Sequence, residues 1–153
     1  MLEKRFKMTT NAEIDLRRNE SVARALAYSS TFVADRAIGA EVWDVEGNRF
    51  IDFAGGIGCQ NVGHGHPKVI SAIEKQAQNF THTCFQISPY QNYILLAERL
   101  NALAPGDFHK KSLFFSAGGE AVENAVKIAR YFTQRPGLIT FTNGYHGRSY
   151  MGM

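Results

Sequence analysis

The stretch SLFFSAGGE, residues 112–120, decides the fold class, because it joins a short apolar run to a turn with two adjacent glycines. Apolar side chains then recur at helical spacing from Ala121 to Phe132, and Pro136-Gly137 ends that helix. The run Leu138–Phe141 predicts a second strand. A strand, a helix and a strand in this order predict parallel strands joined by a crossover helix, which is the repeating unit of α/β proteins.

Upstream of this unit the sequence predicts a hairpin, a glycine-rich loop and two helices. Residues 42–53 contain two short apolar runs around Glu46-Gly47-Asn48, a pattern typical of two strands joined by a tight turn. The segment 52–67 is rich in glycine and lacks periodicity, which indicates a loop whose backbone turns sharply. Apolar periodicity then predicts helices from Pro67 to Phe80 and from about Pro89 to Leu103.

The composition is that of an ordinary globular chain. Of the 153 residues, 44% are hydrophobic and 20% charged, and 17 basic against 14 acidic residues give a formal net charge of +3. The charges are scattered, so no basic face indicates nucleic acid, and no apolar run approaches the length of a membrane helix. The first seven residues lack the apolar core of a signal peptide. We therefore expect a cytoplasmic protein that acts on small molecules or other proteins, with Cys59 and Cys84 as reduced, buried thiols.

The glycine turns of the chain favour an anion site over a nucleotide or metal site. Free backbone N–H groups at a helix start, as expected at Ser116–Glu120, bind phosphate with the help of the helix dipole. Spacing alone equally allows glycines that only permit a tight turn. The dinucleotide fingerprint is excluded, because Asn61 or Lys68 stands where its third glycine is required, and no GxxxxGK loop is present. His64 and His66 have no accompanying carboxylate–histidine cluster, so we assign no metal.

The segment NGYHGR, residues 143–148, follows the second predicted strand. Ligands of open α/β sheets collect beyond the carboxyl ends of the strands, so we expect this segment on the same sheet edge as the Gly118 turn. Tyr145 could stack on a flat heterocycle, and Arg148 could pair with a carboxylate. Taken singly, Tyr145 also fits a packing role and Arg148 a solvated surface charge.

These strings, in this order, resemble the class III aminotransferases, enzymes of fold type I that use pyridoxal 5'-phosphate, and in particular those that act on 4-aminobutyrate. The resemblance covers nearly the whole chain from about Ala12 onward. It implies an α/β fold with residues 1–11 as a tail, 12–60 as a segment of the small domain and 61–153 as the beginning of the large cofactor domain. The strings that carry it are residues 43–53, Asp52–Ile57, Asn61–Pro67, His82–Gln86, Pro105–Phe108, Gly119–Arg130 and Gly144–Arg148.

The resemblance also implies roles for individual residues. Gly118 and Gly119 match the turn that holds the cofactor phosphate, and Tyr145 matches the aromatic residue on the pyridine ring, with His146 beside it. In the substrate site, Arg148 matches the arginine that binds the carboxylate of 4-aminobutyrate. Ile57 matches an apolar residue that lines the substrate path. Many relatives have serine, threonine or alanine where this chain has Gly119, so a hydroxyl contact to the phosphate is missing here.

The chemistry implied is a ping-pong exchange, in which an ω-amino acid such as 4-aminobutyrate passes its amino group through the cofactor to a 2-oxo acid such as 2-oxoglutarate. The family's Schiff-base lysine, and the aspartate that faces the pyridinium nitrogen, have no match in this chain. The lysines that fit no such motif are Lys68, Lys75, Lys110, Lys111 and Lys127. We therefore expect no catalytic residue here and no activity from the 153 residues alone.

Two alternatives stay open. One is a class III transaminase for ornithine or acetylornithine, which residues 82–86 and Arg148 disfavour. The other is a non-catalytic, truncated fragment that only associates with other chains. For a complete enzyme the resemblance implies a homodimer or a larger assembly, with an amino acid and a 2-oxo acid as small-molecule partners and no nucleic acid or membrane.

Overall fold

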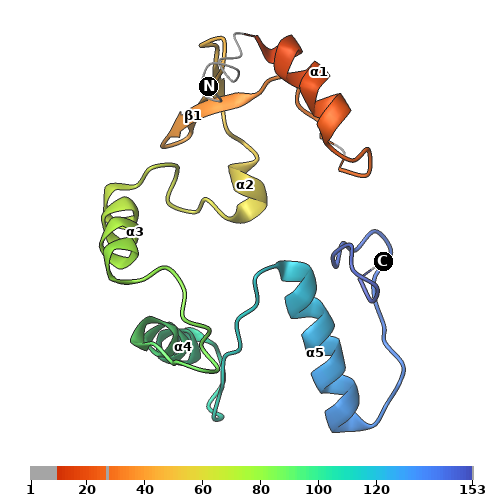
Figure 1. The fold of residues 1–153 in the computed structure, drawn as a ribbon. Coiled ribbons are helices and arrows are strands. Elements are labelled where there is room, and N and C mark those ends of the chain that lie inside the picture. Colours follow the sequence, from red (N-terminus) through yellow and green to blue (C-terminus); the bar gives the residue numbers. More distant parts are fainter. Residues whose placement is uncertain (1–9, 27, 153) are drawn as a thin grey trace. The chain divides into compact units, whose positions relative to one another are not determined.

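The computed structural model describes residues 10–26 and 28–152, which fall into two compact units (Figure 1). The first unit ends at His82 and the second begins at Thr83. The domain boundary predicted at residues 60–61 stays a prediction. Residues 1–9 of the predicted tail lie outside the described residues, and α1 begins at Asn11, the last residue of that tail.

The first unit opens with α1 (Asn11–Ser21), followed by a three-stranded antiparallel sheet in the order β1-β2-β3. Thr10 caps α1, because its hydroxyl oxygen accepts the Glu13 amide at 3.1 Å. The strands are β1 (Ala34–Ile38), β2 (Glu41–Asp44) and β3 (Arg49–Ile51). The hairpin predicted for residues 42–53 is confirmed as β2 and β3, while β1 is an additional strand that its mixed sequence does not indicate.

Asp44 organises this sheet from the end of β2. It and Val42 are the buried residues of the described ranges, with 3% and 8% of their surface exposed. The Asp44 carboxylate accepts hydrogen bonds from the Asn48 amide at 2.8 Å, from the Glu46 amide at 3.0 Å and from the Asn11 side chain at 2.9 Å. Burial opposes ionisation of Asp44, but the bonds from Asn48 and Asn11 outweigh it and hold its pKa below the usual range. The Asp44 carboxylate therefore holds both the turn between β2 and β3 and the start of α1.

The glycine-rich segment after β3 contains one turn of helix, α2 (Gly55–Gly58), in which Gly56 and Ile57 have left-handed backbone angles. Asp52 holds its start, since one carboxylate oxygen accepts the Ala54 and Gly55 amides, both at 2.9 Å. The other oxygen lies 2.6 Å from His64 Nε2. The predicted sharply turning loop is thus observed, and a side-chain network stabilises it.

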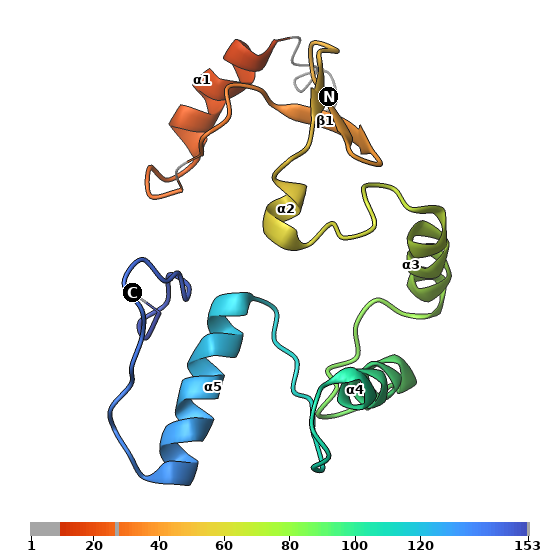
Figure 2. The same ribbon diagram turned by 180° about the vertical axis from the view of Figure 1, so that it is seen from behind.

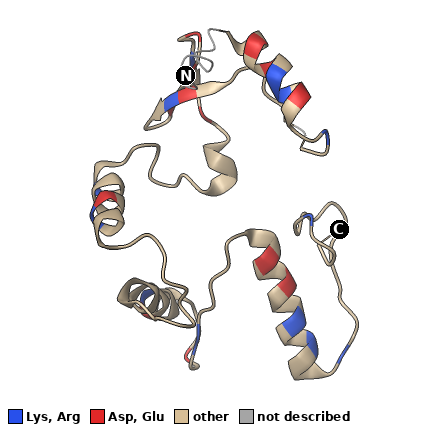
Figure 3. Ribbon diagram, viewed as in Figure 1, with Lys and Arg blue, Asp and Glu red and all other residues tan. Residues whose placement is uncertain are grey.

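The remaining helices follow the apolar periodicity closely. They are α3 (Pro67–Asn79) in the first unit, with α4 (Gln91–Leu103) and α5 (Gly118–Thr133) in the second. Pro67 begins α3 as predicted, and α5 ends before Pro136 at Gln134, a residue with left-handed backbone angles. Acidic residues lie in the first half of α5 and basic residues in its second half, the arrangement that the helix dipole favours (Figure 3).

Two predicted strands are absent. Residues 112–116 and 138–141 have no regular secondary structure, because neither segment has a hydrogen-bonded strand partner among the described residues. The Phe114 amide, for instance, donates to the Tyr93 hydroxyl of α4 at 3.1 Å. The expected burial of both thiols is also wrong: Cys59, which follows α2, is exposed, and Cys84 is half-buried.

Candidate functional site

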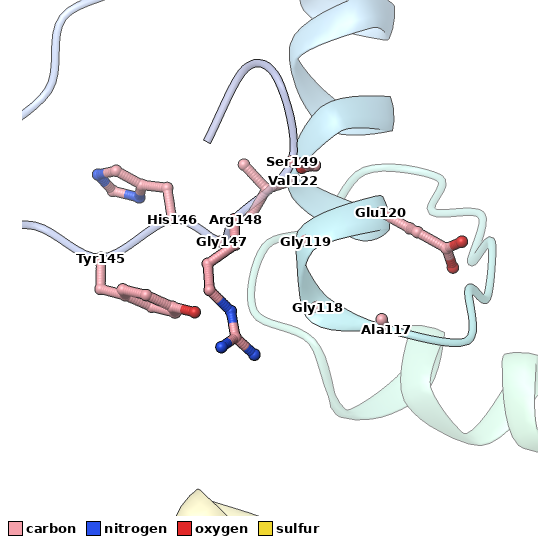
Figure 4. A pocket seen from close by; sticks show the side chains of 10 residues that line it. All are labelled: Ala117, Gly118, Gly119, Glu120, Val122, Tyr145, His146, Gly147, Arg148 and Ser149. Carbon is pink, nitrogen blue, oxygen red and sulfur yellow. The ribbon is translucent and has the colours of Figure 1, made fainter. Parts of the chain in front are cut away.

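The first turn of α5 presents unshielded backbone. Its N-cap, Ala117, makes no side-chain capping bond, and the first N–H groups of a helix have no acceptor within the helix. A Cβ added to Gly118 would meet nothing within 4 Å, so this face of the turn is open. Glu120 points away from it (Figure 4) and accepts the Ser116 amide at 3.1 Å. The turn therefore has the donors and the access that an anion requires.

The segment after α5 runs back beside the helix and lies against this turn (Figure 2). The two chains meet through glycines. A Cβ added to Gly147 would lie 3.0 Å from the Gly119 Cα, and Gly147 has φ +121°, which side chains rarely adopt. Gly147 therefore rests directly on the backbone of the helix start, and the two glycine motifs singled out in the sequence come together.

A hollow of about 560 Å³ opens between the turn and this segment. Its volume is within the range of small-ligand sites. Tyr145 and Arg148 both line it, and the hydroxyl end of Tyr145 points toward the Arg148 side chain (Figure 4). Tyr145 is 76% exposed, so its ring is accessible for stacking. The lining residues are Ala117, Gly118, Gly119, Glu120, Val122, Tyr145, His146, Gly147, Arg148 and Ser149.

The two other predicted site residues are His146 and Ile57. His146 lines the hollow, but its ring points away from Tyr145 and Arg148 (Figure 4), and a Cβ on Gly144 would lie 2.8 Å from its Nε2. Ile57 belongs to the first unit, where it is 94% exposed and has φ 54°. A β-branched residue with positive φ is a true conformational outlier, and such outliers gather at functional sites.

Sequence reasoning missed Glu123. Its carboxylate oxygen accepts the Met151 amide at 3.0 Å, which ties α5 to the turn that follows Arg148. This bond, more than any other contact, holds the pKa of Glu123 below its usual range. The two residues are 28 positions apart, so no local pattern indicates the contact.

In the described ranges, no group of three or more His, Cys, Asp or Glu side chains could hold a metal ion. No helix within those ranges is both long and apolar enough to cross a membrane.

Comparison with known proteins defines the class. The family model of the class III aminotransferases matches residues 23–153, and the chain belongs to this family of enzymes. Among curated relatives, the 4-aminobutyrate aminotransferase GabT of Escherichia coli (strain K12) is 49% identical over 94% of this chain and 34% of its own length. The 5-aminovalerate aminotransferase DavT of Pseudomonas aeruginosa is 52% identical over 93% of this chain and 33% of its own length. The chain thus spans about a third of the length of these relatives.

Solved structures place the fold among the type I aminotransferases, which confirms the predicted fold class. The taurine:2-oxoglutarate aminotransferase of Bifidobacterium kashiwanohense, in complex with PLP and glutamate, matches with a TM-score of 0.80 and 29% identity. The match covers 92% of this chain and 32% of that one. The ornithine aminotransferase of Toxoplasma gondii also matches with a TM-score of 0.80, at 27% identity over 99% of this chain and 36% of that one.

Proposed function

We propose that these residues serve a pyridoxal-phosphate aminotransferase that moves the amino group of 4-aminobutyrate, or a similar ω-amino acid, to a 2-oxo acid such as 2-oxoglutarate. The observation that carries the proposal is the hollow in which Tyr145, Arg148 and the first turn of α5 meet. The chain's part would be to bind the cofactor and the substrate carboxylate. The chemical step would use residues that the resemblance does not locate in this chain.

The residues at the hollow fit the cofactor. Its phosphate needs several N–H donors and close approach to the backbone, and the open side of Gly118 at the start of α5 supports both. Its flat ring needs a stacking partner, which the exposed Tyr145 ring would supply. When bound, pyridoxal phosphate supplies an electron sink for the reacting carbon. Contact of His146 with the cofactor stays a prediction.

The position of Arg148 suits an ω-amino acid. Such a substrate has its reacting amine at one end and a carboxylate at the other, so it needs a cation fixed at a distance from the reacting carbon. A guanidinium group binds a carboxylate through two parallel hydrogen bonds and stays charged at all relevant pH values. Relatives named for 4-aminobutyrate and for the longer 5-aminovalerate both resemble this chain strongly, which supports the class of substrate more than one chain length. Ile57 stays a proposed lining residue of the substrate path.

The proposal also covers the cellular location and the oligomeric state of the enzyme. We propose a cytoplasmic enzyme that works as a homodimer or larger, as the family resemblance implies. The solved structures similar to this chain include an acetylornithine aminotransferase, at 29% identity, besides the ornithine enzyme. These likenesses keep the diamine-acid reading as the alternative, and the higher identity to the GabT and DavT enzymes favours ω-amino acids.

The test is Arg148→Ala in the full-length holoenzyme. Loss of carboxylate binding should lower kcat/KM for 4-aminobutyrate by about 2–5 kcal/mol of transition-state stabilisation, whereas a simple alkylamine should lose far less. Arg148→Lys should recover only part of the loss, because an ammonium group cannot bind bidentately. Steady-state kinetics with both amines provide the measurement.

The matched control is Arg135→Ala, which removes the same side chain outside the hollow and should leave both substrates unaffected. Equal losses for 4-aminobutyrate and the alkylamine in Arg148→Ala would contradict the proposal. Faster turnover of ornithine than of 4-aminobutyrate by the unmodified enzyme would instead select the alternative substrate class.

A further inference from the structure

We infer that Glu123 is a positioning residue: its carboxylate clamps the turn after Arg148 onto α5 and thereby holds Tyr145 and Arg148 at the first turn of that helix. The inference rests on the proposed function for the roles of Tyr145 and Arg148, but the clamp itself does not. It would make substrate recognition depend on a carboxylate that touches neither cofactor nor substrate.

The clamp is a hydrogen-bonded turn on a helical anchor. The Gly152 amide donates to the Ser149 carbonyl at 3.0 Å, which closes the turn, and the Met151 amide within it donates to Glu123 at 3.0 Å. Glu123 is half-buried and lies one helical turn after Gly119, so both are on the same face of α5. A hydrogen bond to an ionised acceptor is stronger than one between neutral groups.

Backbone contacts connect the clamp with the site. A Cβ on Gly152 would lie 2.9 Å from the His146 carbonyl oxygen, and one on Gly147 would lie 3.0 Å from the Gly119 Cα. The turn therefore packs on the segment, and the segment packs on the helix start, with no side chain between them. Arg148 stands between two fixed points, Gly147 on Gly119 and Met151 on Glu123. Loss of the Met151–Glu123 hydrogen bond would leave Arg148 fixed on one side only, at Gly147.

The charges around Glu123 support this role. The Met151 amide and then the Ser149 side chain favour the ionised form of Glu123 most, and Lys127, one turn further along α5, adds a smaller attraction. Arg130 contributes a weaker second contact, with Nη1 4.0 Å from the Met151 sulfur. Both basic groups line one hollow together with Glu123 and Met151. Glu123→Gln removes the charge but keeps an acceptor oxygen, whereas Glu123→Ala removes both, so comparison of the two separates the hydrogen bond from the charge.

The first arm tests the clamp on the 153-residue chain by limited trypsin digestion at the Arg148–Ser149 bond. Glu123→Ala should raise the rate of this cleavage about tenfold, and Glu123→Gln by no more than about threefold, because opening of the turn is what admits the protease. Cleavage after the exposed Lys111, at its bond to Ser112, followed by mass spectrometry in the same digest, reports on loosening of the second unit away from the turn. Glu98→Ala, the same change in the middle of α4, is the matched control and should leave both rates unchanged.

An unchanged Arg148 cleavage rate in Glu123→Ala would overturn the clamp. Equal acceleration at Lys111 would overturn it too, because Glu123 would then support the unit as a whole. The second arm uses the full-length holoenzyme: Glu123→Ala should raise KM for 4-aminobutyrate about fivefold or more with little change for an alkylamine, and Glu123→Gln should restore it. Faster cleavage without this selective KM effect would refute positioning while leaving the clamp. Failure of Arg148→Ala to discriminate the two amines would count against the proposed function alone.

Discussion

At the scale of single residues, Gly119 and Gly147 face each other at the start of α5 but differ in what they tolerate. A Cβ on Gly119 would have the Ser149 Oγ at 3.5 Å and the Gly147 Cα at 3.8 Å, which are ordinary contacts. Gly119→Ser should therefore fit, and its hydroxyl should add the phosphate contact that this chain lacks. We expect the holoenzyme to bind pyridoxal phosphate roughly fivefold more tightly, the value of about one hydrogen bond, in an absorbance titration.

Gly147→Ala provides the contrast to that substitution. Its Cβ would lie 3.0 Å from the Gly119 Cα, and its φ of +121° strains any side chain. We expect weaker cofactor binding and faster trypsin cleavage at Arg148, because the segment can no longer seat on the helix. If both glycine substitutions behaved alike, the close approach of the two backbones would play no part in the site.

Asp52 makes the α2 loop sensitive to acid. The hydrogen bond with His64, followed by that from the Gly55 amide, holds the pKa of Asp52 below its usual range. A lowered folded-state pKa means that the ionised carboxylate stabilises the fold above the usual aspartate range, and that this contribution is lost as pH falls through the folded value. Hydrogen exchange of the Ala54 and Gly55 amides, corrected for intrinsic rates, should lose protection over that acidic range. In Asp52→Asn the protection should not depend on pH there, and an equally steep loss would exclude Asp52 as the cause.

At the scale of elements, helices were predictable and isolated strands were not. The periodicity of α3, α4 and α5 lies within each segment, and proline or a glycine turn marks their ends, so the sequence carries the whole signal. The β2–β3 hairpin is nearly as local, because its turn joins neighbouring residues. Residues 112–116 and 138–141 have strand composition, but a strand also needs a partner, which their own sequences cannot supply.

In the candidate site too, residues in local motifs were predictable and a residue that depends on a distant contact was not. Gly118, Gly119, Tyr145 and Arg148 stand in short strings whose chemistry is readable, and the structure brings them to one hollow. Glu123 was not predictable, because its role depends on a contact with Met151 across 28 positions. A half-buried glutamate in an amphipathic helix is otherwise indistinguishable from a solvated one.

The segment 112–116 is held by α4 in place of a strand partner. Tyr93 accepts the Phe114 amide at 3.1 Å, and its ring packs against Phe85 at 4.0 Å between centroids. Tyr93→Phe keeps the ring and removes the acceptor, so we expect the Phe114 amide to exchange roughly fivefold faster, as for the loss of about 1 kcal/mol. Exchange at Ala104, whose amide bonds to Leu100 within the end of α4, should stay unchanged. Unaltered exchange at Phe114 would show that packing alone holds this segment.

At the scale of the whole molecule, apolar surface is the outstanding feature. Val42 is the one buried apolar residue in the ranges 10–26 and 28–152. Large apolar side chains elsewhere are exposed, among them Ile139 at 97% and Phe141 at 86%. The first unit therefore has a thin core, and the second has no buried apolar residue between Thr83 and Gly152. Burial of apolar surface is the main source of folding free energy. Surface of this kind recruits other chains.

We accordingly expect the 153-residue chain to self-associate. Size-exclusion chromatography with light scattering should show a mass that rises with concentration, because association buries the apolar segments that the chain leaves exposed. Replacing Ile139 with Thr and Phe141 with Lys should reduce the association, since both side chains are almost fully exposed and support no core. Arg135→Lys, a surface change that keeps the charge, should have no effect. A monomer that unfolds cooperatively and keeps one mass at all concentrations would show instead that this limited burial suffices, and would remove the physical basis for the associating-fragment alternative.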